Sequence, residues 1–447
     1  MIPPRQQQSP RGPSNELHHA ARHGQAEHTL ALLSMGSINI NQVDPRGFTP
    51  LMFAAQAGHS HVARILVKRG ANASVASDGG TTALHLSAHN GHLAVTVDLI
   101  KAGANLQARV RHGAMPLHLA TQNGHSVVME ALIKAGADVD SLLGNGGHPP
   151  LYLAAFYGHL DAVKALLRAN ANPLLITTTR SGDISTPLDA AANYGHSEVV
   201  RELIQHDEIE SWGRGSGGLI ALGRAGQTGH VDIMAMLTDA GVVDTLNILI
   251  SVAGCGQEAS VKFLLQQRQL AESPSGLDEY VNCRDHHGCT ALFCAIYGEP
   301  DRDGAPHPSS PRVARLLIDA GADASSLVRV TDTPEGEVLF NGTPLAFTND
   351  CLRRKKVGNN NRDATEEQMH RLKAIRRLLL RVDAARAVSW LWVSREPPLV
   401  RCAAEVSGRA ARKTAASGTQ LALMLPPWRR RRRGVLLAPL FRYSSHP

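Results

Sequence analysis

The chain has 447 residues, of which 43% are hydrophobic, 19% are charged and only 4% are aromatic. This balance excludes a chain that is disordered throughout, and a core with so few rings must be built from Ala, Leu, Val and Ile. No apolar run of about 18 residues occurs and residues 1–14 contain no apolar segment, so the sequence predicts neither a membrane-spanning helix nor a secretory signal.

Charge and cysteine are distributed unevenly along the chain. Residues 351–447 hold 22 Lys and Arg against 6 Asp and Glu, a net charge of +16, whereas residues 1–350 carry a net charge of −9. All six cysteines lie at or beyond Cys255, so they cannot form a disulfide framework for the whole chain, and a reducing compartment is the simpler interpretation. We expect an acidic body with a basic tail, located in the cytoplasm or in the nucleus.

The first segments in chain order are a short leader and a helix pair. Residues 1–13 are rich in Pro and Gln, a composition typical of disorder. Asn15–Leu33 has the pattern of two short helices without a preceding turn. We expect this pair to cap the array of units that follows.

From residue 44 onward the chain repeats itself. A Gly-His pair recurs at spacings of 33, 33, 34, 37 and 34 residues, and a Leu stands seven residues before each Gly. The glycines are Gly58, Gly91, Gly124, Gly158, Gly195 and Gly229, and the leucines are Leu51, Leu84, Leu117, Leu151, Leu188 and Leu222. Self-similarity at such a period indicates a repeat architecture.

One unit, residues 44–76, shows how the pattern predicts structure. Its first four residues, DPRG, are turn formers, Thr49 is a suitable N-cap and Pro50 suits the first helical position. Gly58 fits a left-handed helix stop, and a second apolar periodic segment then ends at Gly70. Helices of two or three turns are not stable alone in water, so each unit must be covered by its neighbours.

Five segments carry a family resemblance: TPLMFAAQAGH, TALHLSAHNGH, MPLHLATQNGH, PPLYLAAFYGH and TPLDAAANYGH. They resemble the ankyrin repeat, whose hallmark is T-P-L-H-x-A-A-x-x-G-H. The resemblance implies an all-α fold, an α-solenoid of stacked ankyrin-type helix-turn-helix repeats over residues 14–382. It further implies a non-enzymatic scaffold or adaptor that binds another protein through the concave face and turn tips of the array.

The units differ in how well they keep the pattern. Clear repeats run over 44–206, a Gly-rich loop is expected at 211–218, degenerate repeats follow over 219–266, and the pattern revives over 285–382 with insertions, the first at 299–311. Residues 383–447 show no helical or strand period. They are either a disordered basic tail or a C-terminus that results from an incorrect gene model.

The resemblance implies that exposed turn and helix-end positions contact the partner. Carried over position by position, the candidates are Arg46, Phe48, Gln56, His89, Asn90, Arg111, His112, Gln122, Asn123, Phe156, Tyr157, Asn193 and Tyr194. Phe156 and Tyr157 are adjacent rings in an aromatic-poor chain, and we expect them to be binding hot spots. The alternative is that both rings pack on the neighbouring unit.

Other motifs have a plainer interpretation. Residues 213–218 match G-x-G-x-x-G but lack the apolar strand of a dinucleotide site, so we interpret them as a linker. Cys283, His286, His287, Cys289 and Cys294 could ligate zinc, although the histidines fall on a turn and Cys294 at a packing position. The histidines of the Gly-His pairs are expected to be structural. No catalytic motif occurs, and we expect no enzyme activity, no metal and no cofactor.

The basic tail supports the alternative function. Arg429, Arg430, Arg431, Arg432 and Arg433 form a run that could direct nuclear import or contact phosphates. A solvated charge run, or a tail that folds back on the acidic array, would have the same sequence. We favour a protein partner for the array, with nucleic acid as the alternative for the tail.

Overall fold

The computed structural model describes most of the repeat region. The described residues are 13–36, 38–144, 147–178, 184–206, 217–243, 248–271, 274–285, 288–297, 310–331, 338–354, 356–357, 362–363 and 366–394. The chain divides into two compact units, residues 1–381 and 382–447. The helix pairs described below belong to the first of these, and the second contributes the end of the last helix.

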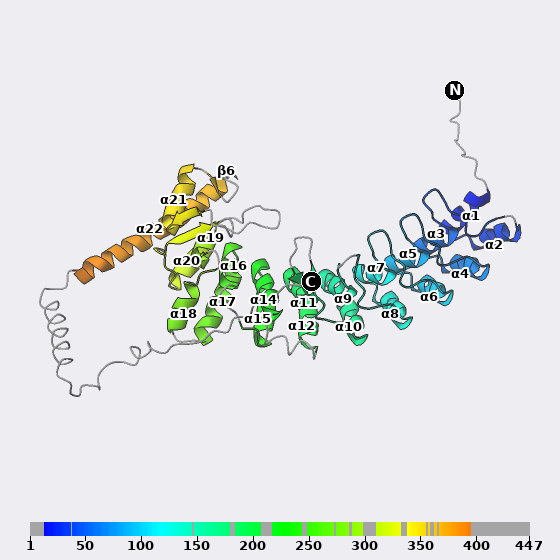
Figure 1. Cartoon of the computed structure of the whole chain (residues 1–447), viewed down its shortest axis with the longest axis horizontal. Helices are drawn as coiled ribbons and strands as arrows, with labels where there is room; N and C mark the ends of the chain where they lie inside the picture. The colour runs from blue at the N-terminus through cyan, green and yellow to red at the C-terminus, as the bar shows by residue number, and fades with distance from the viewer. Residues whose placement is uncertain are drawn as a thin grey trace, which may run out of the picture. The chain divides into compact units, whose positions relative to one another are not determined.

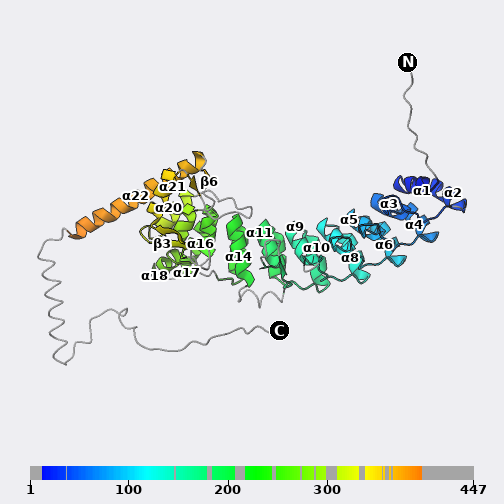
Figure 2. The ribbon, with the colours of Figure 1, turned by 45° about the horizontal axis from the view of Figure 1, so that its top comes forward.

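Within residues 13–204, helix pairs lie side by side in two layers (Figures 1 and 2). Units 1 to 6 are α1 (Pro13–Arg22) with α2 (Ala26–Ser34), α3 (Pro50–Ala57) with α4 (Ser60–Lys68), α5 (Ala83–His89) with α6 (Leu93–Lys101), α7 (Pro116–Gln122) with α8 (Ser126–Lys134), α9 (Pro150–Tyr157) with α10 (Leu160–Arg168), and α11 (Pro187–Tyr194) with α12 (Ser197–Ile204). The first helices form one layer and the second helices the other. The predicted all-α solenoid is confirmed.

Local chemistry sets the ends of each first helix. The Thr49 hydroxyl accepts a hydrogen bond from the Met52 N–H at 3.3 Å, and Pro50 occupies the first helical turn. Thr82 and Thr186 cap α5 and α11 in the same way. Gly58 ends α3 in the left-handed region at φ 78°, where a residue with a Cβ is strained.

The histidines of the Gly-His pairs join consecutive units. In each of five junctions the imidazole Nε2 lies 3.0–3.2 Å from a main-chain oxygen of the preceding first helix. The pairs are His59 with Arg22, His92 with Gln56, His125 with His89, His159 with Gln122 and His196 with Phe156. The ring lies against the glycine of the preceding unit, so that a Cβ at Gly91 would stand 2.6 Å from His125 Nδ1. Glycine is therefore needed there because it tolerates a positive φ and because it leaves room for the imidazole ring. These contacts agree with the structural role predicted for the histidines.

The core between units is built from small and branched apolar side chains. The six leucines that stand seven residues before the Gly-His glycines are at most 2% exposed, and Ala54 and Ala55 are fully buried. Small alanines let successive first helices approach closely, and each helix so covers the apolar face of the next.

Two further histidines, His85 and His118, lie inside the array at 0% and 1% exposure. The Nδ1 atom of His118 accepts the Met115 N–H at 3.3 Å, and its Nε2 lies 2.9 Å from the Ser141 carbonyl oxygen. This pairing requires a neutral ring with its proton on Nε2. Burial accordingly lowers the pKa of His118 to about 4 and lowers that of His85.

The degenerate region keeps the helix-pair plan. Unit 7 is α14 (Gly217–Thr228) with α15 (Val231–Asp239), and unit 8 is α16 (Ile248–Gly254) with α17 (Glu258–Ala271). The loop expected at 211–218 needs correction, because α14 begins at Gly217; residues 207–216 lie outside the described residues. Gly218 is buried, and a Cβ there would stand 2.5 Å from Val242 Cγ2, so its small size lets α14 start close to the end of its own unit.

The last units contain elements that the sequence did not predict. Helix α18 (Pro274–Val281) precedes unit 9, which is α19 (Ala291–Tyr297) with α20 (Pro311–Asp319). Unit 10 is α21 (Pro344–Arg354) with α22 (Glu366–Ser394). Three antiparallel hairpins join helices: β1 (Thr177–Thr178) with β2 (Ile184–Ser185), β3 (Val328–Thr331) with β4 (Val338–Gly342), and β5 (Lys356–Val357) with β6 (Arg362–Asp363).

The two compact units meet at residues 381 and 382, next to the predicted boundary at 383, but the expectation that residues from 383 onward show no helical pattern is corrected. Helix α22 continues through Asp383 to Ser394. No Gly or Pro occurs in this stretch, and the first prolines downstream are Pro397 and Pro398, so nothing in the local sequence stops the helix earlier. Among the described residues no helix is both long enough and apolar enough to cross a membrane.

Candidate functional site

The candidate site is built from the two residues that stand just before the left-handed glycine at the end of successive first helices. These residues are His89 and Asn90, Gln122 and Asn123, Phe156 and Tyr157, and Asn193 and Tyr194. We call these eight residues the helix-end strip. Because the glycine fixes where each helix stops, the repeat places each pair in the same position of its unit.

Side chains link the strip from one unit to the next. Asn123 Nδ2 lies 3.1 Å from His89 Nδ1, and Gln122 Nε2 lies 3.3 Å from the Tyr157 hydroxyl oxygen. The rings of Phe156 and Tyr194 have centroids 4.3 Å apart. The strip is therefore continuous over α5, α7, α9 and α11.

Three rings form the aromatic part of the strip, at Phe156, Tyr157 and Tyr194. Phe156 meets Tyr157 edge to face at a centroid distance of 4.9 Å. Tyr157 and Tyr194 are each 42% exposed, whereas Phe156 is half-buried between them. Such packing holds the two tyrosine rings in place while one side of each stays open to solvent.

The structure corrects three candidates that were expected to be exposed. Phe156 and Asn193 are half-buried, and so is Phe48. Phe48 packs on Phe53 with a centroid distance of 5.7 Å, and the Arg46 guanidinium covers its ring at 5.0 Å. Phe156 packs on Tyr194 of the next unit, as the packing alternative expects of this ring, whereas Phe48 packs on a ring of its own unit.

The remaining candidates lie in exposed positions outside the strip. Arg46 forms an ion pair with Asp44 in its own turn at 3.3 Å, and the Arg111 N–H donates to the Gly79 carbonyl oxygen at 2.8 Å. His112 is exposed beside Arg111 in the same turn, and Gln56 is exposed near the end of α3. The five arginines of the tail lie outside the described residues.

Sequence reasoning missed an exposed arginine at the N-terminal end of the array. Arg22 ends α1, and its guanidinium carbon stands 4.5 Å above the ring of Phe53 in the next unit. In the sequence Arg22-His23-Gly24, Arg22 and His23 occupy the two positions before a glycine that the strip residues occupy in later units. That spacing was the signal that could have identified it.

One buried carboxyl group departs from the repeat pattern. Asp189 stands where His85 and His118 stand in their units, is 2% exposed, and accepts hydrogen bonds from the Thr186 N–H and hydroxyl at 2.8 Å. Its second oxygen, Oδ1, has no hydrogen-bond partner among the described residues. Burial raises the pKa of Asp189 to about 6. This group bears on stability, since it is enclosed and faces no open surface.

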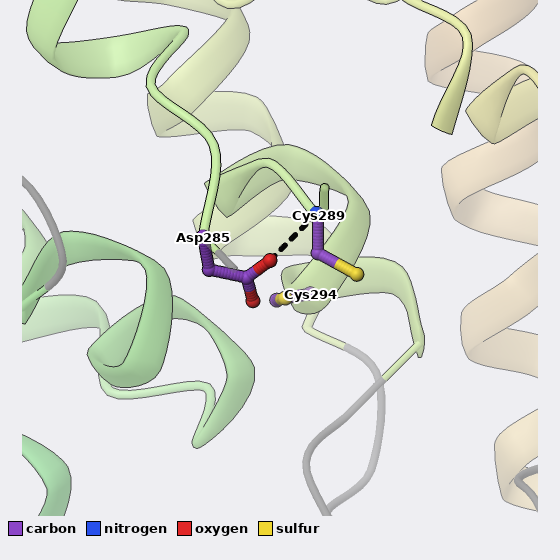
Figure 3. Close-up of side chains that lie close together, drawn as sticks. All are labelled: Asp285, Cys289 and Cys294. Carbon is purple, nitrogen blue, oxygen red and sulfur yellow. Dashed lines mark hydrogen bonds between the residues drawn. The ribbon is translucent and has the colours of Figure 1, made fainter. Parts of the chain in front are cut away.

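The cysteine cluster differs from the one expected. The structure brings Asp285, Cys289 and Cys294 together (Figure 3), with their ligand atoms within 4.8 Å of one another. Cys283 is half-buried outside this group, and His286 and His287 lie outside the described residues. Asp285 was not among the candidate ligands, because an aspartate at this position is expected to form the turn.

Comparison with known proteins identifies the repeats. A model of ankyrin repeats in three copies matches residues 17–110 and 96–177, and a model of a single ankyrin repeat matches residues 183–210. The chain is 45% identical over 56 residues, 12% of its length, to E3 ubiquitin-protein ligase KEG of Arabidopsis thaliana. It is 42% identical over 59 residues, 13% of its length, to alpha-latrocrustotoxin-Lt1a of Latrodectus tredecimguttatus. These alignments span only 3% and 4% of the two proteins, so the activity of neither protein carries over to this chain.

Proposed function

The chain is an ankyrin repeat protein, and from that premise we propose that it is a non-enzymatic scaffold or adaptor that binds another protein through the helix-end strip. Ankyrin repeats generally mediate protein–protein interaction. The observation that carries the choice of surface is the pair of half-exposed rings, Tyr157 and Tyr194, at 42% exposure each. Large rings held in one conformation contribute disproportionately to binding energy, since little side-chain entropy is lost on binding.

The chemistry of the strip suggests the chemistry of its partner. None of its eight residues is Asp, Glu, Lys or Arg. The strip offers ring faces, amide groups and hydroxyl groups, which pack and hydrogen-bond without ion pairs. We therefore expect a partner segment with apolar and uncharged polar side chains, and an affinity that depends weakly on salt.

Affinity capture with the full chain as bait tests this surface. The variant Tyr157→Ala/Tyr194→Ala should lose the captured partner, because it removes both open rings. Val127→Ala is the matched control, since Val127 is 60% exposed on α8, in the other helix layer. Thermal unfolding of both variants must stay close to that of the wild type. Capture that survives the double substitution contradicts the proposal.

Raising the salt concentration separates this proposal from the alternative function of the basic tail. Binding to nucleic acid through Arg429–Arg433 would weaken steeply with salt, because each phosphate contact releases counterions. Binding through the strip should change little between low and physiological salt. We propose the cytoplasm as the compartment, with the nucleus as the alternative if a chain lacking residues 395–447 changes its location in cells.

A further inference from the structure

The side chains of Asp285, Cys289 and Cys294 converge at the start of unit 9 (Figure 3). Asp285 lies in the turn before α19, Cys289 stands two residues before this helix, and Cys294 lies within it. Cys289 and Cys294 are each 7% exposed as residues, whereas Asp285 is half-buried. The cluster therefore has a closed sulfur side and an oxygen side that solvent can reach.

The repeat itself creates this convergence. In unit 2 the equivalent positions hold Asp44, Phe48 and Phe53. Asp44 Oδ1 accepts the Phe48 N–H at 2.8 Å, just as Asp285 Oδ1 accepts the Cys289 N–H at 2.8 Å, and the two Phe rings touch.

The ligand chemistry at these positions is particular to unit 9. In units 3 and 4 the equivalent residues are Ser77, Thr81 and Leu86, and Val110, Ala114 and Leu119. Two thiols and a carboxylate at three positions that the fold brings together are thus not required by the repeat. Packing at the same positions is served elsewhere by Leu, Ala and Phe.

We propose that Asp285, Cys289 and Cys294 bind a thiophilic divalent cation, with zinc as the best fit. Zinc prefers four ligands of the thiolate, imidazole and carboxylate classes, at about 2.3 Å for sulfur and about 2.0–2.2 Å for oxygen. Ligand atoms around a tetrahedral ion then lie about 3.5–3.8 Å apart. The atoms of this cluster, all within 4.8 Å, reach that spacing by a contraction of about 1 Å, which side-chain rotation supplies.

The described residues supply three ligands, which leaves the fourth position of the ion to water or to a group outside them. On binding, the two thiol protons pass to solvent, so that two thiolates and one carboxylate surround the dication. The ion would tie the turn of unit 9 to the first helix of the same unit. It acts there as a structural crosslink.

Metal titration of the reduced, chelator-treated full chain tests the site. Cobalt(II) is the probe, because thiolate ligation gives a charge-transfer absorption that a carboxylate or a surface histidine does not give. We expect one equivalent of cobalt to bind with this absorption and one equivalent of zinc to displace it. Cys289→Ser and Cys294→Ser should each abolish the absorption or lower the affinity at least about tenfold.

Two variants keep the test decisive. Asp285→Asn keeps an oxygen that accepts the Cys289 N–H but removes the charge, and should lower the affinity about 10-fold or more without opening the core. Cys283→Ser is the matched control, since Cys283 precedes Asp285 by two residues but lies outside the cluster, and it should bind as the wild type does. Circular dichroism confirms that each variant keeps its helices.

The proposal is overturned if the wild type gives no thiolate absorption with cobalt. It is also overturned if Cys294→Ser and Asp285→Asn, both folded, bind as tightly as the wild type, or if Cys283→Ser alone removes binding. These outcomes do not depend on the helix-end strip, because that surface lies on other units.

Discussion

At the end of α10, Asn170 occupies a backbone position that glycine holds in neighbouring units. Its φ is 59°, and it is the one residue other than glycine with a positive φ among the described residues. Gly70, Gly103 and Gly136 take the equivalent positions at φ 76–94°. Asparagine tolerates this region better than other residues with a Cβ, because its short amide group can hydrogen-bond locally.

Substitutions at Asn170 should separate backbone strain from side-chain contacts. Asn170→Ala should lower the free energy of unfolding by about 1 kcal/mol, because alanine is strained at this φ. Asn170→Gly should stay within about 0.5 kcal/mol of the wild type. Urea denaturation of the three proteins gives both values. Equal stability of the alanine and glycine variants would show that the backbone conformation is not what the residue serves.

Asp189 makes stability depend on pH in a predictable direction. Its pKa is about 6 in the folded chain and near 3.8 when unfolded, so the folded chain binds more protons between these values. The contribution of this group is fully present below about pH 4 and is lost as the pH rises through 6. His118, whose pKa is lowered to about 4, acts in the opposite sense, and its contribution is lost as the pH falls from 6.5 toward 4.

The variant Asp189→Asn isolates the carboxyl group from the histidines. It should match the wild type near pH 4 and be more stable at pH 8, by up to about 3 kcal/mol, since the amide has no charge to bury. The difference between the two unfolding free energies, measured from pH 4 to pH 8, tests this. A difference that is constant over this range would mean that Asp189 does not titrate as the structure indicates.

At the scale of the element, each helix pair depends on the junction between its first helix and the histidine of the next unit. Gly91 and Gly103 have nearly the same φ, 75° and 76°, but different surroundings. A Cβ at Gly91 would stand 2.6 Å from His125 Nδ1, whereas a Cβ at Gly103 would meet nothing within 4 Å.

These two glycines form a matched pair of tests. Gly103→Ala should lower the free energy of unfolding by about 1–2 kcal/mol through backbone strain alone. Gly91→Ala should lower it by about 1 kcal/mol more, because the His125 ring must move and its hydrogen bond to the His89 carbonyl oxygen is weakened. Chemical denaturation of both variants gives the difference. Equal losses would mean that the histidine junction adds nothing to stability.

At the scale of the whole molecule, stability is a sum over units and the interfaces between them. The last unit closes the array with α22, whose Leu372, Ile375 and Leu379 are at most 1% exposed. Leu372 packs with Cys351, Phe347 and Leu352 of α21. An array without this cover exposes the apolar side of its last hairpin.

Truncations at two points test this division of roles. Removal of residues 366–447 should lower the midpoint of thermal unfolding, since each of the three buried side chains of α22 contributes about 1.5–3 kcal/mol. Removal of residues 395–447 should leave the midpoint unchanged, because none of the packing described for units 1 to 10 involves them. Calorimetry of the full chain and both truncated chains measures the effect. Loss of stability on the shorter truncation would assign the tail a structural role.

The sequence alone determined the repeating unit, because its signals are local. The spacing of Gly58, Gly91 and Gly124, with Thr49 and Pro50 at a helix start, follows from backbone conformation and capping within one unit. These local signals also fixed where each first helix ends, and therefore identified most candidate residues of the site. It did not predict α18 or the β3–β4 hairpin, where the repeat signals are absent.

Only the tertiary structure decided which side chains meet across units and turns. The half-buried state of Phe156, the contact of Gln122 with Tyr157, and the convergence of Asp285 with Cys289 and Cys294 depend on how consecutive elements pack. The number of residues between two positions does not predict the distance between their side chains, because residues far apart in the sequence become neighbours only when helices stack. The burial of Asp189 is likewise a property of the packed helices.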